Sequence, residues 1–550
     1  MKRAVAFTGV IVALCSCAQP VPRGGHVVVA LSSDASVLNP LIATGSNTST
    51  VLQFLFTELV EHDFDSETGT DSLIPRIAKS WSWSEDRKSL TYQLRADLRW
   101  SDGVPITAHD IAYSYRLLGY KEIPSVRKGK LDHFVRSESG EIDWDRAVLA
   151  RNDSTIEFRF DSAYRRENQL DDTQMAFVPG HIFRSMDVSK VASSEFNSKP
   201  VTANQFRLKT WNKKQEIVLE RDPGWLLPHA AHLDEVVFRV IPDMTARLVE
   251  LQTGGVDMVE GLTPAQALEV SKNGNCRIER QENRRLEYIG WSNIDQTAYR
   301  KDKTIRPHPL FGDARVRKAL TTAIDRDLLV QAALESYGRT ADGPVSPAFR
   351  WAVNDTLRPI SYDPDLAKRM LSEAGWFDHD GDGILDRNGI SFEFTLTTNS
   401  GNERRAFVAE RVRDALERIG IRVHVLQLES NAYNTGLRNR EFDAFIAGQV
   451  VNLGLELQNQ FGSDLEKNSF NVAGFQNRSV DSLLERASTY WRLVDAAHEL
   501  KQVQAILLEE QPITFLYWYD NLIAIRNRLQ GTHVSILSPY HRFYDWYVKE

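Results

Sequence analysis

One acidic turn has the residue types and the spacing of a calcium loop. Residues 378–386 read Asp-His-Asp-Gly-Asp-Gly-Ile-Leu-Asp. This order places side-chain oxygens at positions 1, 3, 5 and 9 of such a loop and the turn glycine at position 6. Position 12 is Gly389, where calcium loops carry an acid that binds with both oxygens. We therefore interpret the segment as a solvated turn and predict no metal site and no cofactor; a calcium site is the alternative.

The N-terminus carries a second chemical possibility, covalent attachment of lipid. Lys2 and Arg3 precede an apolar stretch, 4–13, which has the length of a signal-peptide core and is too short to span a bilayer. The next residues are Leu-Cys-Ser-Cys, ending at Cys17. They resemble the bacterial lipobox, in which the leader is cut before the Cys and the Cys is acylated. We predict a signal peptide over 1–16 and lipidation of Cys17. The alternatives are an ordinary secretory signal and a buried apolar N-terminus.

The remaining composition argues against several classes of protein. The sequence lacks the H-E-x-x-H, G-x-S-x-G and Walker A patterns, so we predict that the protein is not an enzyme. Its three cysteines give neither a disulfide framework nor zinc spacing, and Cys276 is interpreted as an inert thiol. Acidic residues number 74 against 66 basic ones, which makes nucleic acid an unfavourable partner. The 42% hydrophobic content is that of a globular chain.

Hydrophobic periodicity predicts the helices and strands that would position a functional site. Apolar residues at spacings of three and four predict helices over 48–61, 107–118 and 403–419, with Thr107 as an N-cap. Alternating or β-branched runs predict strands over 26–31, 90–94 and 236–240. In the region 391–448, strands alternate with helices. This alternation predicts a largely parallel sheet there.

Several segments in a fixed order carry a resemblance to a known family. Residues 100–110 read Trp-Ser-Asp-Gly-Val-Pro-Ile-Thr-Ala-His-Asp, and similar stretches lie at 73–81, 238–243, 251–257, 313–326 and 373–376. Together they resemble the family 5 extracytoplasmic solute-binding proteins of ABC importers, the oligopeptide- and dipeptide-binding group. Each stretch also has a structural explanation, such as the turn made by Gly103 and Pro105.

The resemblance implies an α/β fold of the periplasmic-binding-protein type. Two hinged lobes are joined by crossover strands near Ile289 and Phe515, and a small α+β domain is inserted in the first lobe. The expected divisions are a signal peptide (1–16), a lipid-anchored tether (17–25), the base lobe (26–62, 201–284 and 514–550), the inserted domain (63–200) and the hinged α/β lobe (285–513). Such proteins enclose their ligand between the lobes.

Relatives that bind peptides hold the ligand's ammonium with an Asp, and the matching position here is Asn452. An amide cannot neutralise an ammonium, so either the ligand lacks a free amino terminus or another acid, such as Glu456 or Asp34, serves. A shifted alignment across this variable loop is a further alternative. The ligand-binding residues that the resemblance predicts are Ser32, Ser33, Asp34, Asn293, Gln449, Val450 and Asn452.

The sequence thus predicts a lipid-anchored, monomeric protein on the periplasmic face of a bacterial membrane or on the cell surface. It would capture a peptide or peptide-like solute and present it to an ABC permease, whose ATPase subunits supply the energy. The alternatives are a ligand sensor or surface binding protein without a transport role, and an importer component for a non-peptide solute such as an oligosaccharide or a metal chelate.

Overall fold

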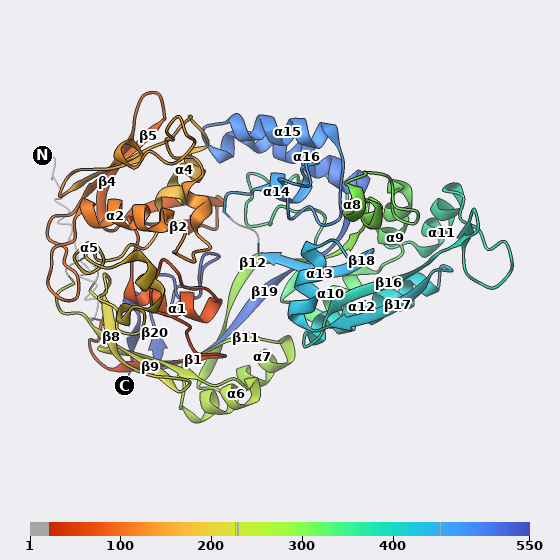
Figure 1. Ribbon diagram of the computed structural model, residues 1–550. Coiled ribbons are helices and arrows are strands. Elements are labelled where there is room, and N and C mark those ends of the chain that lie inside the picture. Colours follow the sequence, from red (N-terminus) through yellow and green to blue (C-terminus); the bar gives the residue numbers. More distant parts are fainter. Residues whose placement is uncertain (1–20, 226, 228–229, 451–452, 550) are drawn as a thin grey trace, which may run out of the picture.

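Two long strands form the spine of the protein in the computed structural model, which describes residues 21–225, 227, 230–450 and 453–549. They are β12 (Cys276–Trp291) and β19 (Ile513–Arg526), paired antiparallel along their length. Both predicted crossover positions, Ile289 and Phe515, lie in these strands. Figure 1 shows β12 and β19 passing from one half of the molecule to the other. The predicted signal peptide, Cys17 and Asn452 lie outside the described residues.

A single sheet continues from the spine into both halves. Its order is β17-β16-β18-β12-β19-β11-β1-β10-β9-β8, with β13 (Gly338–Thr340) also pairing with β19. On the first-lobe side, the strands are β11 (Met258–Leu262), β1 (His26–Leu31), β10 (Glu235–Val240), β9 (Glu216–Arg221) and β8 (Phe206–Asn212). Strands β1 and β10 are parallel, and β9 and β10 are antiparallel. The predicted strands over 26–31 and 236–240 are confirmed.

The predicted helix over 48–61 is only partly correct. Helix α1 (Ser46–Leu55) ends six residues early, and strand β2 (Val60–Asp65) begins inside the predicted range. The cause is a tertiary contact, because Phe56 is extended and bridges Ala203, whose carbonyl accepts the backbone N–H of Thr57. Pairing with a distant segment overrides the local helical pattern. The residues after Leu55 therefore enter a strand.

The inserted region contains a second, four-stranded antiparallel sheet. Its order is β4 (Ala78–Trp83), β5 (Ser89–Leu94), β7 (Thr155–Arg159) and β6 (Val148–Asn152). Helix α2 (Ala108–Gly119) packs on β6 and β7 and begins after the predicted N-cap Thr107, which forms a capping box with Asp110. Strands β2 and β3 (Thr70–Pro75) form a separate hairpin. One continuous apolar core joins this region to the first lobe.

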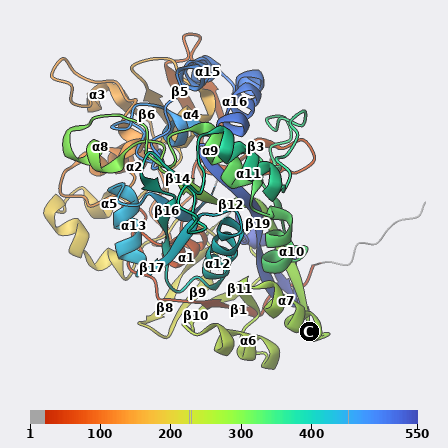
Figure 2. The same cartoon turned by 90° about the vertical axis from the view of Figure 1, so that its right-hand side faces the viewer.

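The hinged lobe has the predicted parallel arrangement. Strand β16 (Glu393–Asn399) pairs in parallel with β17 (Arg422–Leu428) and β18 (Ala444–Val450). Helix α12 (Glu403–Glu417) links β16 to β17, and helix α13 (Ser430–Arg438) links β17 to β18. Two large apolar cores and one small cluster of the described residues belong to this lobe, separate from the core of the first lobe. In Figure 2 the lobe faces the viewer, with α12 beside α10 (Arg326–Leu334). Its other long helices are α9 (Ala314–Thr322), α11 (Pro364–Glu373), α15 (Arg478–Thr489) and α16 (Ala497–Glu510).

No helix within the described ranges is long and apolar enough to cross a membrane.

Candidate functional site

A cavity of about 1040 Å³ lies between the two lobes. The first lobe and the inserted region supply the end of α1, the β2–β3 hairpin, helix α4 (Arg166–Thr173) and the segment 537–544. The hinged lobe supplies Phe349, Trp351, Leu453, Gly454, Glu456, Leu493 and Val494. Its volume is at the upper end for small-molecule sites, which span about 300–1,000 Å³. A ligand in this cavity would contact both lobes at once.

The lobes touch at one side of the cavity through the tip of the β2–β3 hairpin. Trp351 of the hinged lobe donates its indole N–H to the carbonyl oxygen of Gly69 at 2.8 Å. Beside it, the rings of Phe64 and Phe349 meet edge to face with centroids 5.6 Å apart. Gly69 has a φ of 73°, and a Cβ there would lie 2.5 Å from the carbonyl oxygen of Ala348. The hairpin tip therefore fits the hinged lobe only because this residue is glycine.

A second contact closes the other side, at the start of α4. The guanidinium group of Arg165 donates one N–H to the carbonyl oxygen of Ala487, at an N–O distance of 2.6 Å. It donates a second N–H to the carbonyl oxygen of Gly454, at 3.4 Å. The backbone N–H of Leu493 donates to the Glu167 carboxylate at 3.0 Å. Burial lowers the pKa of Arg165, but an Arg remains charged at any physiological pH. These polar contacts cross between the lobes, so they form only when the lobes are together.

Part of a strand with an unpaired edge lines the cavity. Residues 69–73 line it consecutively, and they include most of β3. Among the described strands, β3 pairs only with β2, so its outer edge has free backbone N–H and C=O groups. An extended peptide can add to such an edge as a further strand.

Most charged side chains of the first-lobe wall are already paired. Arg76 lies 3.4 Å from Glu61, which also faces His541 at 3.5 Å. The carboxylate of Asp71 lies 2.7 Å from Nδ1 of His62. Burial opposes protonation of His62, but the hydrogen bond and charge of Asp71 outweigh it and raise the pKa of this imidazole.

Three of the predicted ligand residues follow β1 and lie away from the cavity wall. Ser32 and Ser33 accept hydrogen bonds from the side-chain amide of Asn47. The Asp34 carboxylate accepts the indole N–H of Trp211 at 2.9 Å and the backbone N–H of Lys214 at 2.8 Å. These bonds occupy Asp34, which is not among the residues lining the cavity. The structure therefore gives it no support as an ammonium-binding acid.

The predicted residues of the hinged lobe are also not brought together at the cavity. Asn293 is buried and donates to the carbonyl oxygens of Trp291 and Pro512 at 2.7 and 3.0 Å, a structural role. Gln449 donates to Gln460 at 3.0 Å, and Val450 is exposed at the end of β18. Their assignment to the ligand site stays a prediction, as does that of Asn452. The residues that follow Asn452 do reach the cavity, beginning with Leu453.

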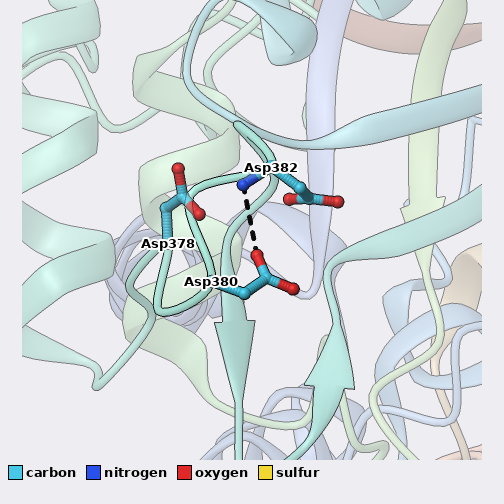
Figure 3. Close-up of side chains that lie close together, drawn as sticks. All are labelled: Asp378, Asp380 and Asp382. Atoms are coloured by element: carbon cyan, nitrogen blue, oxygen red, sulfur yellow. Dashed lines mark hydrogen bonds between the residues drawn. The ribbon is translucent and has the colours of Figure 1, made fainter.

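The acidic turn brings Asp378, Asp380 and Asp382 together on the surface, with one carboxylate oxygen of each within 4.8 Å of the others (Figure 3). The carboxylates accept backbone N–H groups of their own loop, including that of Gly381 at 2.8 Å. Such bonds are typical of solvated Asx turns. The turn contributes no residue to the cavity lining.

Sequence reasoning missed the residues that shape the cavity, such as Gly69, Trp351 and Arg165. Gly69 lies in a Thr-Gly-Thr turn, and this turn glycine was the only available signal. Glu58 was also missed, because it falls inside the predicted helix over 48–61. The partners of Gly69, Trp351 and Arg165 across the cavity lie hundreds of positions away in the chain.

Comparison with known proteins gives the family. The profile described as bacterial extracellular solute-binding proteins, family 5 Middle, matches residues 72–461. The chain belongs to this family. The oligopeptide-binding protein AppA of Bacillus subtilis (strain 168) is 29% identical over 533 residues, covering 96% of this chain and 92% of that protein. Heme-binding protein A of Haemophilus influenzae is 24% identical over 499 residues, covering 86% and 83%.

The family assignment agrees with the fold of solved structures. The structure of AppA from Bacillus subtilis in complex with a nonapeptide superposes with a TM-score of 0.75 at 26% identity, covering 96% of this chain and all of that one. The predicted resemblance and the predicted two-lobed α/β fold are thereby confirmed. Family 5 relatives are named for different ligands, so membership alone does not select the solute.

Proposed function

We propose that this family 5 protein captures a peptide between its two lobes and presents it to an ABC permease. The observation that carries the proposal is the cavity of about 1040 Å³, which is lined from both lobes and bordered by contacts on two sides. A ligand that touches both lobes favours their closure, because it makes its full set of contacts only in the closed state. No reaction on the ligand is part of this role.

A peptide fits the cavity better than a compact solute. The free edge of β3 offers main-chain hydrogen bonds along an extended wall, and such bonds recognise peptide backbone whatever its side chains. The relative AppA is named an oligopeptide-binding protein and has been solved with a nonapeptide. Both points favour a peptide of several residues over the oligosaccharide or metal chelate of the alternative hypothesis.

Delivery and anchoring are part of the same proposal. Acylation of Cys17 would tether a monomer to the periplasmic face of a membrane, where the tether 17–25 leads into the base lobe. The domain boundaries given above are proposed on the same basis. The change from Asp to Asn452 adds that, unless another acid of the cavity holds the ammonium, peptides with blocked amino termini, or long peptides held along their backbone, bind better than free di- and tripeptides.

The test is to identify what the protein carries. The protein is extracted from membranes with detergent and purified without added ligand. It is then denatured, and the released small molecules are analysed by mass spectrometry. We expect a mixture of peptides several residues long. A single non-peptide solute, which also raises the melting temperature when added back, would contradict the proposal.

A further inference from the structure

Glu58 differs from the other acidic residues of the cavity wall. It lies between the end of α1 and the start of β2, and it lines the cavity as a partly exposed residue. Within the described part of the chain, its carboxylate has neither a hydrogen bond nor an ion pair. Burial raises the pKa of the Glu58 carboxyl above its usual range. The Glu58 side chain is therefore surrounded largely by protein, and its remaining exposed part faces the cavity.

Every other carboxylate that lines the cavity has a partner in the protein. Glu61 faces Arg76, Asp71 faces His62, Glu167 accepts the N–H of Leu493, Asp171 faces Lys130, and Glu456 accepts from Asn168. These acids are held in place by the fold. Glu58 is the described acid of this wall that has no such partner.

The cations nearest to Glu58 are also engaged elsewhere. Lys130 lies 2.9 Å from the Asp171 carboxylate and donates to the same residue's carbonyl oxygen. Arg127 donates to the carbonyl oxygen of Ala43 at 2.9 Å. His62 is bound to Asp71. Their charges reach Glu58 only through space, so the carboxylate keeps an unsatisfied preference for a cation at hydrogen-bond distance.

We propose that Glu58 holds a cationic group of the bound ligand, either a free amino terminus or the side chain of a basic residue. The inference rests on the proposed peptide-binding function and names the ligand chemistry of the same cavity. An ammonium or guanidinium that enters the cavity would form a charge-assisted hydrogen bond with this carboxylate. Relatives use an Asp at the position of Asn452 to hold the ligand's ammonium. Glu58 could supply the negative charge that Asn452 lacks.

The charge state of Glu58 makes the binding depend on pH. In the empty cavity burial favours the neutral acid, with Lys130, His62 and Arg127 favouring the charged form and Asp171 opposing it. A bound cation lowers the pKa of Glu58, so ligand binding releases a proton at pH values between the two pKa values. Affinity for a cationic ligand should therefore fall as the pH is lowered through the pKa of the empty site, and be constant above it.

The test compares four peptides by calorimetry. Ala-Ala-Lys-Ala-Ala and its norleucine analogue are each prepared with a free and an acetylated amino terminus. We expect wild type to prefer the peptides that carry the relevant cation, and Glu58→Gln to lose about ten- to a hundred-fold in affinity for those peptides alone. The lysine and acetylation arms show which cation is held. Glu456→Gln tests the alternative acid of the wall, and we expect this variant to keep the preference.

Each contrary result has a separate meaning. Equal affinities of wild type and Glu58→Gln for all four peptides would overturn the role of Glu58 and leave peptide binding intact. Loss of the preference in Glu456→Gln instead of Glu58→Gln would overturn it as well. If wild type binds none of the peptides, the proposed function itself fails.

The melting temperature without ligand shows whether Glu58→Gln is folded and whether the charged Glu58 carboxylate destabilises the wild-type protein. An acid with a raised pKa in the folded state destabilises that state above this pKa, and the penalty disappears once both states are protonated. Unliganded Glu58→Gln should therefore melt at a higher temperature than wild type at about pH 8 and at the same temperature at about pH 4. A lower melting temperature of Glu58→Gln than of wild type at about pH 8 would contradict the claim that the Glu58 carboxylate is buried without a partner in the empty cavity.

Discussion

The contact between Gly69 and the hinged lobe can be tested by adding one methyl group. In Gly69→Ala the new Cβ would lie 2.5 Å from the carbonyl oxygen of Ala348 and 2.7 Å from the backbone nitrogen of Arg350. Both are backbone atoms, so the hairpin tip or the hinged-lobe loop must move. The open form has no such collision, because Ala348 and Arg350 belong to the other lobe. The substitution therefore acts mainly on closure.

The expected loss of affinity in Gly69→Ala is worked out from two separate free-energy costs. An Ala at the positive φ of 73° costs about 1–2 kcal/mol of folding free energy in either form of the protein. The collision adds about 1–3 kcal/mol to the closed form alone, as overpacking does in cores. A coupling of that size weakens ligand binding by about 5- to 150-fold.

A matched control separates the two costs. Gly140 has a φ of 82° and a Cβ there would have open space around it, so Gly140→Ala carries only the backbone strain. Both variants should lose similar melting temperature when unliganded. Calorimetric titration with a co-purified peptide should show weaker binding for Gly69→Ala only. If Gly69→Ala binds as tightly as Gly140→Ala, this contact is not part of the ligand-bound state.

Four further predictions follow from other parts of the chain. Cys17→Ala should lose labelling by radioactive palmitate; labelling equal to that of wild type would refute lipidation at this residue. Asn452→Asp should bind free-amine tripeptides more tightly than wild type, by about ten-fold or more in calorimetry, and unchanged affinity would mean that the aligned position is misplaced. The acidic turn should show no micromolar calcium affinity, and a calorimetric calcium signal that disappears in Asp380→Ala would prove this wrong. Glu287 is fully buried and pairs with Arg404 at 2.8 Å and with Arg405, so Glu287→Gln should lower the free energy of unfolding by about 3–5 kcal/mol in urea titration; an unchanged midpoint would contradict this.

Local patterns in the sequence predict much of the hinged lobe. The helix predicted over 403–419 is found as α12, and the strands on either side of it pair in parallel. The prediction succeeds because the apolar periodicity and Gly420 mark nearly the same helix boundaries as those in the folded protein. The capping box at Thr107 and Asp110 is equally local. Each of these features is determined within about twenty residues of sequence.

The cavity could not be predicted in the same way. Its wall joins residues from 40 to 544, so the contacts that define it are tertiary. The end of α1 shows the difficulty, because pairing of Phe56 with Ala203 ends the apparent helix at Leu55, and Glu58, three residues later, lines the cavity. Family resemblance directed attention instead to Asp34 and Asn293, which the structure shows bonded within the protein.

The most direct test of the central claim is a crystal structure of the protein purified with its natural ligand bound. We predict an extended peptide backbone in the cavity, hydrogen-bonded to the outer edge of β3 and covered by the contact between Gly69 and Trp351. A compact non-peptide solute in the cavity, or a peptide bound elsewhere with β3 free, would contradict the account.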